Sequence, residues 1–455
     1  MSCAKKVEEI HGICDGYSHD GKGIIHDGNQ PIFVDSLLKG EEADVTIEYV
    51  SAGILHGKIK KLYSFSKNRV LPKCPVGTSC GGCCFQNLSY PAQLEYKKEK
   101  VQTCFRKIAQ MDVDVDDCVG MENPYHYRNK IQMPVGKDKK GRIITGFYKS
   151  KTHQIIPVKS CAIEHPSASH IIETIRELMK KYRIPPYDED ALQGIIRHIY
   201  IRTSYYEKQI LLVLVTAVDA FPGRNDFIKE IRKLHPEITS IVQNINTRDT
   251  NVILGNKNRV LSGPGYIEDS LCGIRFRISP MSFYQVNPQQ TEKLYSLAIQ
   301  KAGLTGNEVV LDAYCGIGTI GLIASKHAKH VIGVEIVEDA IRDAKNNARR
   351  NSVENIEFYA EDASEFIEKL AKSNMKMDVV FMDPPRKGST TIFMDALMKL
   401  SPKKIVYISC DPATLARDVK YLSKEYEIQS ISPVDMFPMG FHIETIVCLK
   451  KKVVI

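Results

Sequence analysis

A thiol and a carboxylate near the end of the chain are of the types that covalent catalysis requires. Cys410 lies in "ISCDPATL", between a strand-like and a helix-like run, so its thiol precedes a helix N-terminus. Helix N-termini favour anions, and the thiolate is the nucleophilic form of cysteine. Glu444 lies in "GFHIETIVCL", where apolar neighbours would raise the carboxyl pKa and suit it to accept a proton. A buried strand-end cysteine and a surface glutamate are the plain alternatives.

A strand that runs into a glycine-containing turn lies upstream of this pair. The stretch "VVLDAYCGIGTIGL" predicts a loop whose backbone can approach a ligand closely. Asp312 ends this strand, and Glu335 ends the next one, where a carboxylate can accept both hydroxyls of a ribose. NAD fits the glycine spacing, but "MDPPR" places Asp383 after a later strand, as in many methyltransferases that use S-adenosylmethionine. We therefore expect a methyl donor.

A thiol, a carboxylate and a methyl donor together indicate one reaction. Carbon 5 of uracil is too weak a nucleophile to take a methyl group unaided. Addition of the Cys410 thiolate to carbon 6 generates an enolate that activates carbon 5. After methyl transfer a base such as Glu444 removes the hydrogen on carbon 5, and elimination frees the thiol. Amino methylation of adenine or glutamine is a rival, but it uses an aromatic residue after D/N-P-P, where this chain has Arg386.

Cysteines crowd into the eleven-residue stretch "CPVGTSCGGCC" at Cys74, Cys80, Cys83 and Cys84. No signal peptide is visible, and the longest apolar run, 210–218, is too short to span a bilayer. We therefore expect a cytoplasmic protein whose thiols stay reduced, and its odd number of cysteines, 13, also argues against full disulfide pairing. Metal binding is the expected role, and four thiolates suit zinc and a [4Fe–4S] cluster about equally.

The elements that must position these residues fall into three parts. Residues 1–66 alternate short strand-like runs with Gly, Asp and Asn turns, which predicts a small β-barrel of the oligonucleotide-binding (OB) type. Residues 67–280 are rich in strands that interleave basic and aromatic residues, as single-stranded RNA requires. Residues 281–455 predict a doubly wound parallel α/β sheet with a final antiparallel pair. The net charge, 62 minus 54 or +8, also suits a nucleic-acid partner.

Taken together, these motifs resemble the bacterial 23S rRNA (uracil-5-)-methyltransferase family, the iron–sulfur branch of the RNA uracil-5-methyltransferases that use S-adenosylmethionine. The resemblance covers nearly the whole chain and rests on "CPVGTSCGGC", Cys161, "SFYQVNPQQTEKLY", "LDAYCGIGTIGL", "DPPRKG", "ISCDPATLARD" and "HIETIVCL". It implies a multidomain fold: an N-terminal TRAM β-barrel, a central β-rich domain that carries a [4Fe–4S] cluster, and a C-terminal Rossmann-like class I methyltransferase domain.

The same resemblance implies residue roles. Cys410 would be the nucleophile and Glu444 the proton acceptor. The contacts to S-adenosylmethionine would be Gln285, Tyr314, Glu335, Asp362 and Asp383, of which Asp362 matches the family pattern least closely. The cluster ligands would be Cys74, Cys80, Cys83 and Cys161. Cys84 and Thr319 receive no role.

The resemblance also implies 23S rRNA as the substrate, with one uracil or more modified, and neither a membrane nor an obligate partner protein. Transfer RNA is the nearest alternative, but members that act on tRNA usually lack both the barrel and the cysteine cluster. A non-catalytic, metal-dependent RNA-binding protein is the remoter alternative. It predicts that loss of Cys410 leaves RNA modification unchanged.

Overall fold

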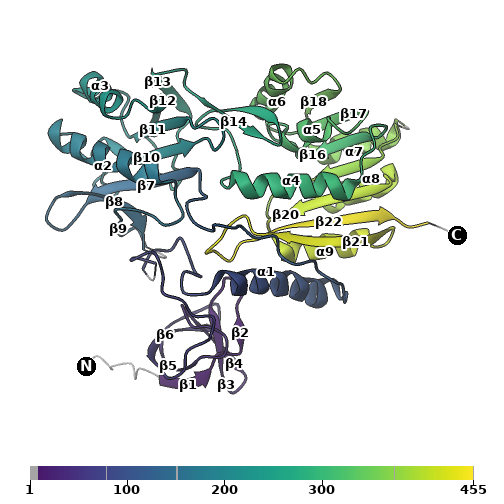
Figure 1. Ribbon diagram of the computed structural model, residues 1–455, viewed down its shortest axis with the longest axis horizontal. Coiled ribbons are helices and arrows are strands. Elements are labelled where there is room, and N and C mark those ends of the chain that lie inside the picture. Colours follow the sequence, from purple (N-terminus) through teal and green to yellow (C-terminus); the bar gives the residue numbers. More distant parts are fainter. Residues whose placement is uncertain (1–8, 78, 150–151, 374, 454–455) are drawn as a thin grey trace.

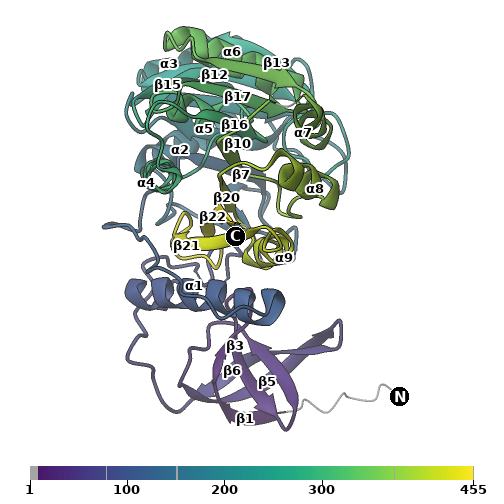
Figure 2. The same cartoon turned by 90° about the vertical axis from the view of Figure 1, so that its right-hand side faces the viewer.

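The computed structural model describes residues 9–77, 79–149, 152–373 and 375–453. Within these ranges the strands form three large sheets and one hairpin. Figures 1 and 2 both show the N-terminal sheet at one end of the molecule, a long helix next to it, and the other sheets beyond that helix. None of the helices in the described ranges is long and apolar enough to cross a membrane.

The N-terminal part is a six-stranded curled sheet. Its strands, in the order β1-β5-β6-β4-β3-β2, are β1 (Glu9–Ile13), β2 (Gly16–Tyr17), β3 (Gly23–Asp27), β4 (Gln30–Val34), β5 (Glu42–Ser51) and β6 (Ile54–Leu62). The two outer strands, β1 and β2, follow one another in the chain, so the sheet curls until its edges meet at Cys14. Ile25, Ile32 and Val45 lie in a small core that belongs to this sheet alone.

Helix α1 (Tyr90–Cys104), followed by the π-helical turn η1 (Phe105–Ala109), lies between the curled sheet and the rest of the molecule (Figures 1 and 2). On one side the Tyr96 hydroxyl donates to the carbonyl oxygen of Ser18 at 3.1 Å, which ties the helix to the curled sheet. On the other side Val101 is buried in the core of the C-terminal sheet. Helix α1 falls within residues 67–280, which the sequence assigns to the central part, but it packs on the C-terminal sheet.

A fully buried ion pair joins α1 to the segment before the last strand. The Lys97 ammonium contacts the Asp435 carboxylate, and both side chains are 0% exposed. Lys97 also donates to the carbonyl oxygen of Phe437 at 3.0 Å. Asp435 accepts from the Tyr90 hydroxyl at 2.9 Å and from the backbone N–H of Phe437 at 3.1 Å. Each charge therefore has further polar partners, which is the condition under which a buried pair is tolerated.

The central part is a mixed seven-stranded sheet in the order β13-β12-β11-β10-β7-β8-β9. Its strands are β7 (Lys130–Lys137), β8 (Ile143–Tyr148), β9 (Ile155–Pro157), β10 (Ile196–Thr203), β11 (Ile210–Thr216), β12 (Ile238–Ile245) and β13 (Lys257–Ser262). Helices α2 (Pro166–Lys181) and α3 (Arg224–Leu234) cover one face. The other face packs on the hairpin of β14 (Ile267–Leu271) and β15 (Ile274–Ile278). The apolar run at 210–218 forms β11, which is buried throughout, as expected.

The C-terminal part is a seven-stranded sheet in the order β18-β17-β16-β19-β20-β22-β21. Its strands are β16 (Val309–Ala313), β17 (His330–Glu335), β18 (Ile356–Ala360), β19 (Val379–Met382), β20 (Lys404–Ser409), β21 (Tyr426–Val434) and β22 (Glu444–Lys451). The first five strands in the order are parallel, while β22 is antiparallel to both of its neighbours. The parallel sheet and the antiparallel final pair predicted from the sequence are confirmed.

Helices cover both faces of this sheet. One face carries α4 (Pro288–Ala302), α5 (Thr319–Ala324) and α6 (Glu338–Arg350), and the other carries α1, α7 (Ala363–Lys372), α8 (Thr391–Leu400) and α9 (Pro412–Leu422). Because both faces are covered, the central strands are continuous apolar runs, and this is why they were visible in the sequence.

Replacing Lys97 with Met should lower the free energy of unfolding by about 3–5 kcal/mol, because the Asp435 carboxylate would stay buried without its counter-charge. Urea denaturation measures the change. The matched control is Lys98→Met, which breaks a pair with the exposed Asp117 and should have little effect. Equal, small effects of both changes would show that the buried pair does not hold α1 in place.

Candidate active site

The strand order brings the predicted catalytic and donor-binding residues to one edge of the C-terminal sheet. The carboxyl ends of β16, β17, β19 and β20 lie at this edge and carry Asp312, Glu335, Asp383 and Cys410. Strand β22 runs in the opposite direction, so it begins at the same edge with Glu444. Ser409 pairs with Thr445 across β20 and β22, and the same register carried one residue further places Cys410 opposite Glu444. The nucleophile and base inferred from sequence thus lie on adjacent strands.

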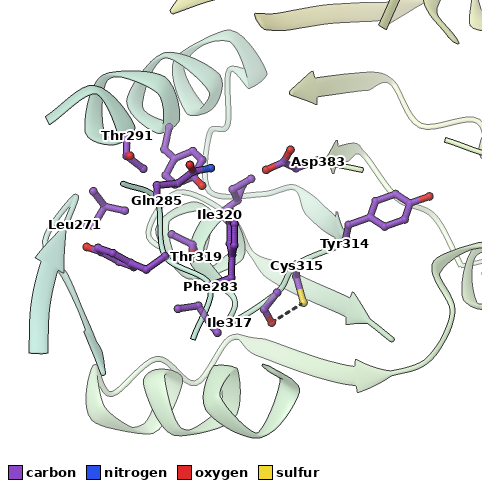
Figure 3. Close-up of a pocket in the computed structure, with 13 residues that line it drawn as sticks. Leu271, Phe283, Gln285, Thr291, Tyr314, Cys315, Ile317, Thr319, Ile320 and Asp383 are labelled. Atoms are coloured by element: carbon purple, nitrogen blue, oxygen red, sulfur yellow. Dashed lines mark hydrogen bonds between the residues drawn. The ribbon is translucent and has the colours of Figure 1, made fainter. Parts of the chain in front are cut away.

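A pocket with about 470 Å³ of empty space, its open mouth included, lies at this edge (Figure 3). Three of the predicted donor contacts line it, namely Gln285, Tyr314 and Asp383. Thr319, which received no role from the sequence, lines it as well. Phe283, labelled in Figure 3, also lines the pocket and is 74% exposed. The pocket is therefore partly apolar and open to solvent on the side of the loop before α4.

The turn after β16 has a constrained backbone. Tyr314 is left-handed, with φ of +64°, which costs a non-glycine residue about 1–2 kcal/mol. Its ring points away from the pocket centre in Figure 3, and its hydroxyl lies 3.1 Å from that of Ser389. A side chain at Gly318 would be strained, because its φ is +81° and a Cβ there would lie 2.7 Å from the ring of Phe358. The glycine of the motif is thus required by packing as well as by its turn.

Two further predicted donor contacts, Glu335 and Asp362, do not line this pocket. The Glu335 carboxylate accepts the backbone N–H groups of Gly316 at 3.3 Å and Val337 at 3.0 Å. The first of these bonds stabilises the glycine turn after β16. Asp362 is exposed and caps α7, since its Oδ1 accepts the N–H of Ser364 at 2.8 Å. Both residues have a positioning task in the fold, and their contact with the donor stays a prediction.

The edge is rich in buried carboxyl groups. Burial raises the pKa of Asp383 to about 7 and that of Asp312 to about 8. The pKa of Glu444 is raised well above its ordinary value, first by burial and then by the charge of Asp383, while Arg386 opposes the rise. Asp312 accepts the N–H of Gly321 at 2.7 Å through Oδ2, whereas its buried Oδ1 has no partner among the described residues. Burial thus favours the protonated forms of these carboxyls, and a cation bound beside them would favour the ionised forms.

The Cys410 thiol differs from the sequence-based expectation that a helix N-terminus favours its ionised form. Asp411 caps α9 and accepts two backbone N–H groups of its first turn, so the side chain of the next residue occupies the helix terminus. Burial, followed by the charges of Glu444 and Asp383, raises the pKa of Cys410 to about 11. Arg386, which hydrogen-bonds the thiol, acts in the opposite direction. The protein alone therefore holds Cys410 as a neutral thiol.

Two residues at this edge were missed in the sequence. There, Arg386 served only to argue against amino methylation. Its position directly after "DPP" could have indicated a residue at the same edge as Cys410. Tyr295 of α4 is buried, hydrogen-bonds Gln285 and lies within electrostatic reach of Asp383. Nothing local in the sequence marks Tyr295, because its position depends on how α4 packs against the sheet.

The cysteine stretch forms a separate group with Cys161. Cys83 interacts electrostatically with Cys74 and Cys80, and Cys161 interacts with Cys83. All four are free cysteines. Cys84 packs in a different apolar cluster from Cys83 and Cys161. It too interacts electrostatically with Cys83, so its exclusion from the group stays a prediction. Across the described ranges, no three His, Cys, Asp or Glu side chains converge closely enough to hold a metal ion.

The segment between β21 and β22 connects the cysteine stretch with Glu444. The carbonyl oxygen of Met439 accepts the backbone N–H groups of Cys84 at 3.0 Å and Phe85 at 3.1 Å. The N–H of Met439 donates to the side chain of Gln93 on α1 at 2.9 Å. Strand β22 then begins at Glu444, five residues after Met439. The segment that contacts the cysteine stretch and α1 therefore leads directly to the proposed base.

The order of the C-terminal sheet, the glycine turn after its first strand and the acidic edge define a class I methyltransferase that uses S-adenosylmethionine. The family model described as tRNA (Uracil-5-)-methyltransferase matches residues 89–452. The chain therefore belongs to this family of RNA uracil-5-methyltransferases.

Similar proteins agree with this assignment. An RNA methyltransferase of Clostridium tetani is 44% identical over 98% of this chain and 97% of its own. One of Listeria innocua is 42% identical over 99% of each chain. The fold is similar to that of the tRNA (uracil-54, C5)-methyltransferase of Pyrococcus abyssi in complex with S-adenosyl-L-homocysteine, with 26% identity and a TM-score of 0.78 over 97% of this chain and 100% of that chain.

Alkylation of Cys410 by iodoacetamide should be slow at pH 7 and rise about tenfold per pH unit toward pH 11, because the thiolate reacts and its pKa is raised. Arg386→Ala should slow alkylation at pH 8 by roughly three- to tenfold, since the group that lowers this pKa is lost. Mass spectrometry of the Cys410 peptide measures the rate. Lys387→Ala is the matched control, and an equal loss there would mean that Arg386 does not act on the thiol.

Proposed function

We propose that this protein methylates carbon 5 of uracil in 23S rRNA through a covalent adduct of Cys410. The observation that carries the mechanism is that Cys410 lies within electrostatic reach of both Glu444 and Asp383, and Asp383 lines the donor pocket. The choice of 23S rRNA is supported by the four-cysteine group, which matches the iron–sulfur branch of the family.

Transfer RNA is the second candidate, and one comparison favours it. The tRNA enzyme of Pyrococcus abyssi matches 97% of this chain, including the N-terminal curled sheet. The expectation that enzymes acting on tRNA lack that part therefore has less force than it had from the sequence alone.

Cys410 acts first in the proposed reaction. The thiol first gives its proton to solvent. The thiolate sulfur then forms a bond to carbon 6 of uracil, and the electron pair of the 5,6 double bond moves to give an enolate. Arg386 stabilises the thiolate through its hydrogen bond to the sulfur. Carbon 5 then takes the methyl group from the sulfonium of S-adenosylmethionine, whose carbon–sulfur bond breaks and leaves neutral S-adenosylhomocysteine.

Glu444 completes the reaction. Its carboxylate removes the proton on carbon 5, the electrons of that bond restore the double bond, and the Cys410 thiolate leaves carbon 6. The sulfonium charge of the donor favours the ionised forms of Asp383 and Glu444, whose pKa values are raised when the site holds no cation. Donor binding thus prepares the base.

A [4Fe–4S] cluster on Cys74, Cys80, Cys83 and Cys161 is part of the proposal. Four free thiols gathered from two segments are a suitable donor set, and a cluster is larger than a single ion, so its ligands need not converge as zinc ligands do. Bound there, the cluster would cross-link the two segments, and no step of methyl transfer uses it. Free thiols also fit a cytoplasmic protein.

We further propose that the N-terminal curled sheet is a TRAM-type OB barrel that binds RNA. Tyr63 and Phe65, both just beyond the end of β6, are 47% and 72% exposed. Exposed aromatic rings are surfaces on which unpaired bases stack.

Incubation with S-adenosylmethionine and RNA from cells that lack the protein should place 5-methyluridine in 23S rRNA and leave tRNA unchanged. Nucleoside mass spectrometry measures both. Cys410→Ala should abolish the product, because no adduct can form, whereas Cys104→Ala, at the end of α1, should retain activity. 5-Methyluridine in tRNA alone would show that tRNA, the second candidate, is the substrate.

RNA that contains 5-fluorouracil should trap the wild-type protein as a stable adduct, because fluorine cannot leave carbon 5 as a proton. With ordinary RNA, Glu444→Gln should accumulate a methylated covalent adduct, since the base is missing. Denaturing gels and intact mass spectrometry detect both species. Normal turnover by Glu444→Gln would exclude Glu444 as the base.

Protein purified without oxygen should be brown and contain about four iron atoms per chain. Cys161→Ala should lose most of this iron, whereas Cys84→Ala should keep it, because Cys84 packs in a different cluster. Metal analysis measures both. A colourless protein with one zinc ion per chain would show that these cysteines bind zinc and not an iron–sulfur cluster.

A further inference from the structure

A second hollow, which we call the hairpin groove, lies on the central part of the molecule. It is formed by the turn between β7 and β8, the end of β9, the last turns of α2 and residues 183–186, and it has about 1680 Å³ of empty space, its open mouth included. Figure 1 places α2, β8 and β9 at the left of the molecule, whereas β20 and β22 lie to the right. The groove is therefore separate from the donor pocket and from Cys410.

Basic side chains dominate the groove. It is lined by two acidic residues, Asp138 and Glu177, and by seven basic residues, Lys137, Lys140, Arg142, Lys159, Arg176, Lys180 and Arg183. Both acids already have partners, since Asp138 pairs with Arg142 at 2.7 Å and Glu177 with Arg176 at 3.6 Å. The other five basic residues form no ion pair with any residue that the structure describes. The groove thus has an excess of five positive charges.

The groove is built on ordered backbone and has an apolar floor. Asp138 fixes the β7–β8 turn, because its Oδ1 accepts the N–H groups of Lys140 and Arg142, both at 2.9 Å. The floor includes Ile144, Met179 and Pro186. Separated cations over an apolar floor suit a chain that carries regularly spaced negative charges and apolar rings, which is the chemistry of RNA.

We propose that the hairpin groove binds the sugar–phosphate backbone of the RNA substrate at a point remote from the uracil that is methylated. This rests on the proposed function, because one RNA must reach both the groove and Cys410. An acidic protein segment would meet the same charges, but RNA is favoured because the family acts on RNA. A long RNA would then be bound at two places, the hairpin groove and the site at Cys410. The groove would contribute to the affinity for RNA and not to the chemical step.

The test compares Lys137→Gln/Lys180→Gln with the wild-type protein in binding an oligouridylate of about 60 nucleotides, several times the length of a usual single site. Fluorescence anisotropy at several salt concentrations gives the salt dependence of the Kd. Loss of two phosphate contacts should lower the slope of log K against log salt by about 1.4. In methylation of RNA from cells that lack the protein, KM should rise roughly three- to tenfold with kcat unchanged.

The matched control is Lys229→Gln/Lys233→Gln, which removes the same charge from α3, outside the groove. It should keep the wild-type slope and KM, and circular dichroism checks that both variants fold. An unchanged slope in the groove variant, or an equal loss in the control, would overturn the proposal. If the wild-type protein methylates no RNA, the proposed function fails, while the binding measurement still decides whether the groove holds RNA.

Discussion

The buried ion pair between Lys97 and Asp435 is the contact on which the arrangement of the molecule depends. Lys97 belongs to α1, which contacts the curled sheet on its other side, and Asp435 begins the segment that leads to Glu444. Since an unpaired charge cannot stay buried without a large loss of stability, α1 and this segment are stabilised in one relative position. Met439, in the same segment, accepts two N–H groups of the cysteine stretch. The curled sheet, the cysteine stretch and α1 are thereby held against the catalytic edge.

The catalytic edge is electrostatically incomplete until its donor binds. Asp383 and Glu444 are buried together, and Asp312 has an oxygen without a partner among the described residues. A sulfonium compensates this excess of acidic groups, and the neutral product of methyl transfer does not. Loss of the sulfonium charge favours the protonated forms of these carboxyls, which weakens the hold on the product.

The C-terminal sheet could be predicted because its strands are buried on both faces and are continuous apolar runs. The short motifs at the strand ends also marked Cys410, Asp383 and Glu444, since parallel strands end at one edge. The ionisation of Cys410 was predicted wrongly, because burial raises the pKa of its thiol and the side chain of Asp411 caps the helix terminus that the pattern assigned to the thiol. The packing of α1 could not be read from its pattern either, because Lys97 looks like a surface residue and its partner lies 338 positions away.

The insertion of β22 between β20 and β21 has a consequence for synthesis on the ribosome. Cys410 and the whole donor pocket are translated before Glu444, and β21 cannot join the sheet until β22 is available to pair with it. A nascent chain that ends within β21 therefore has a donor pocket and a thiol but no base, and one edge of β20 lacks its neighbour. In the proposed reaction, the capacity to complete a methyl transfer therefore arises only when the last strand has left the exit tunnel and paired with β20 and β21.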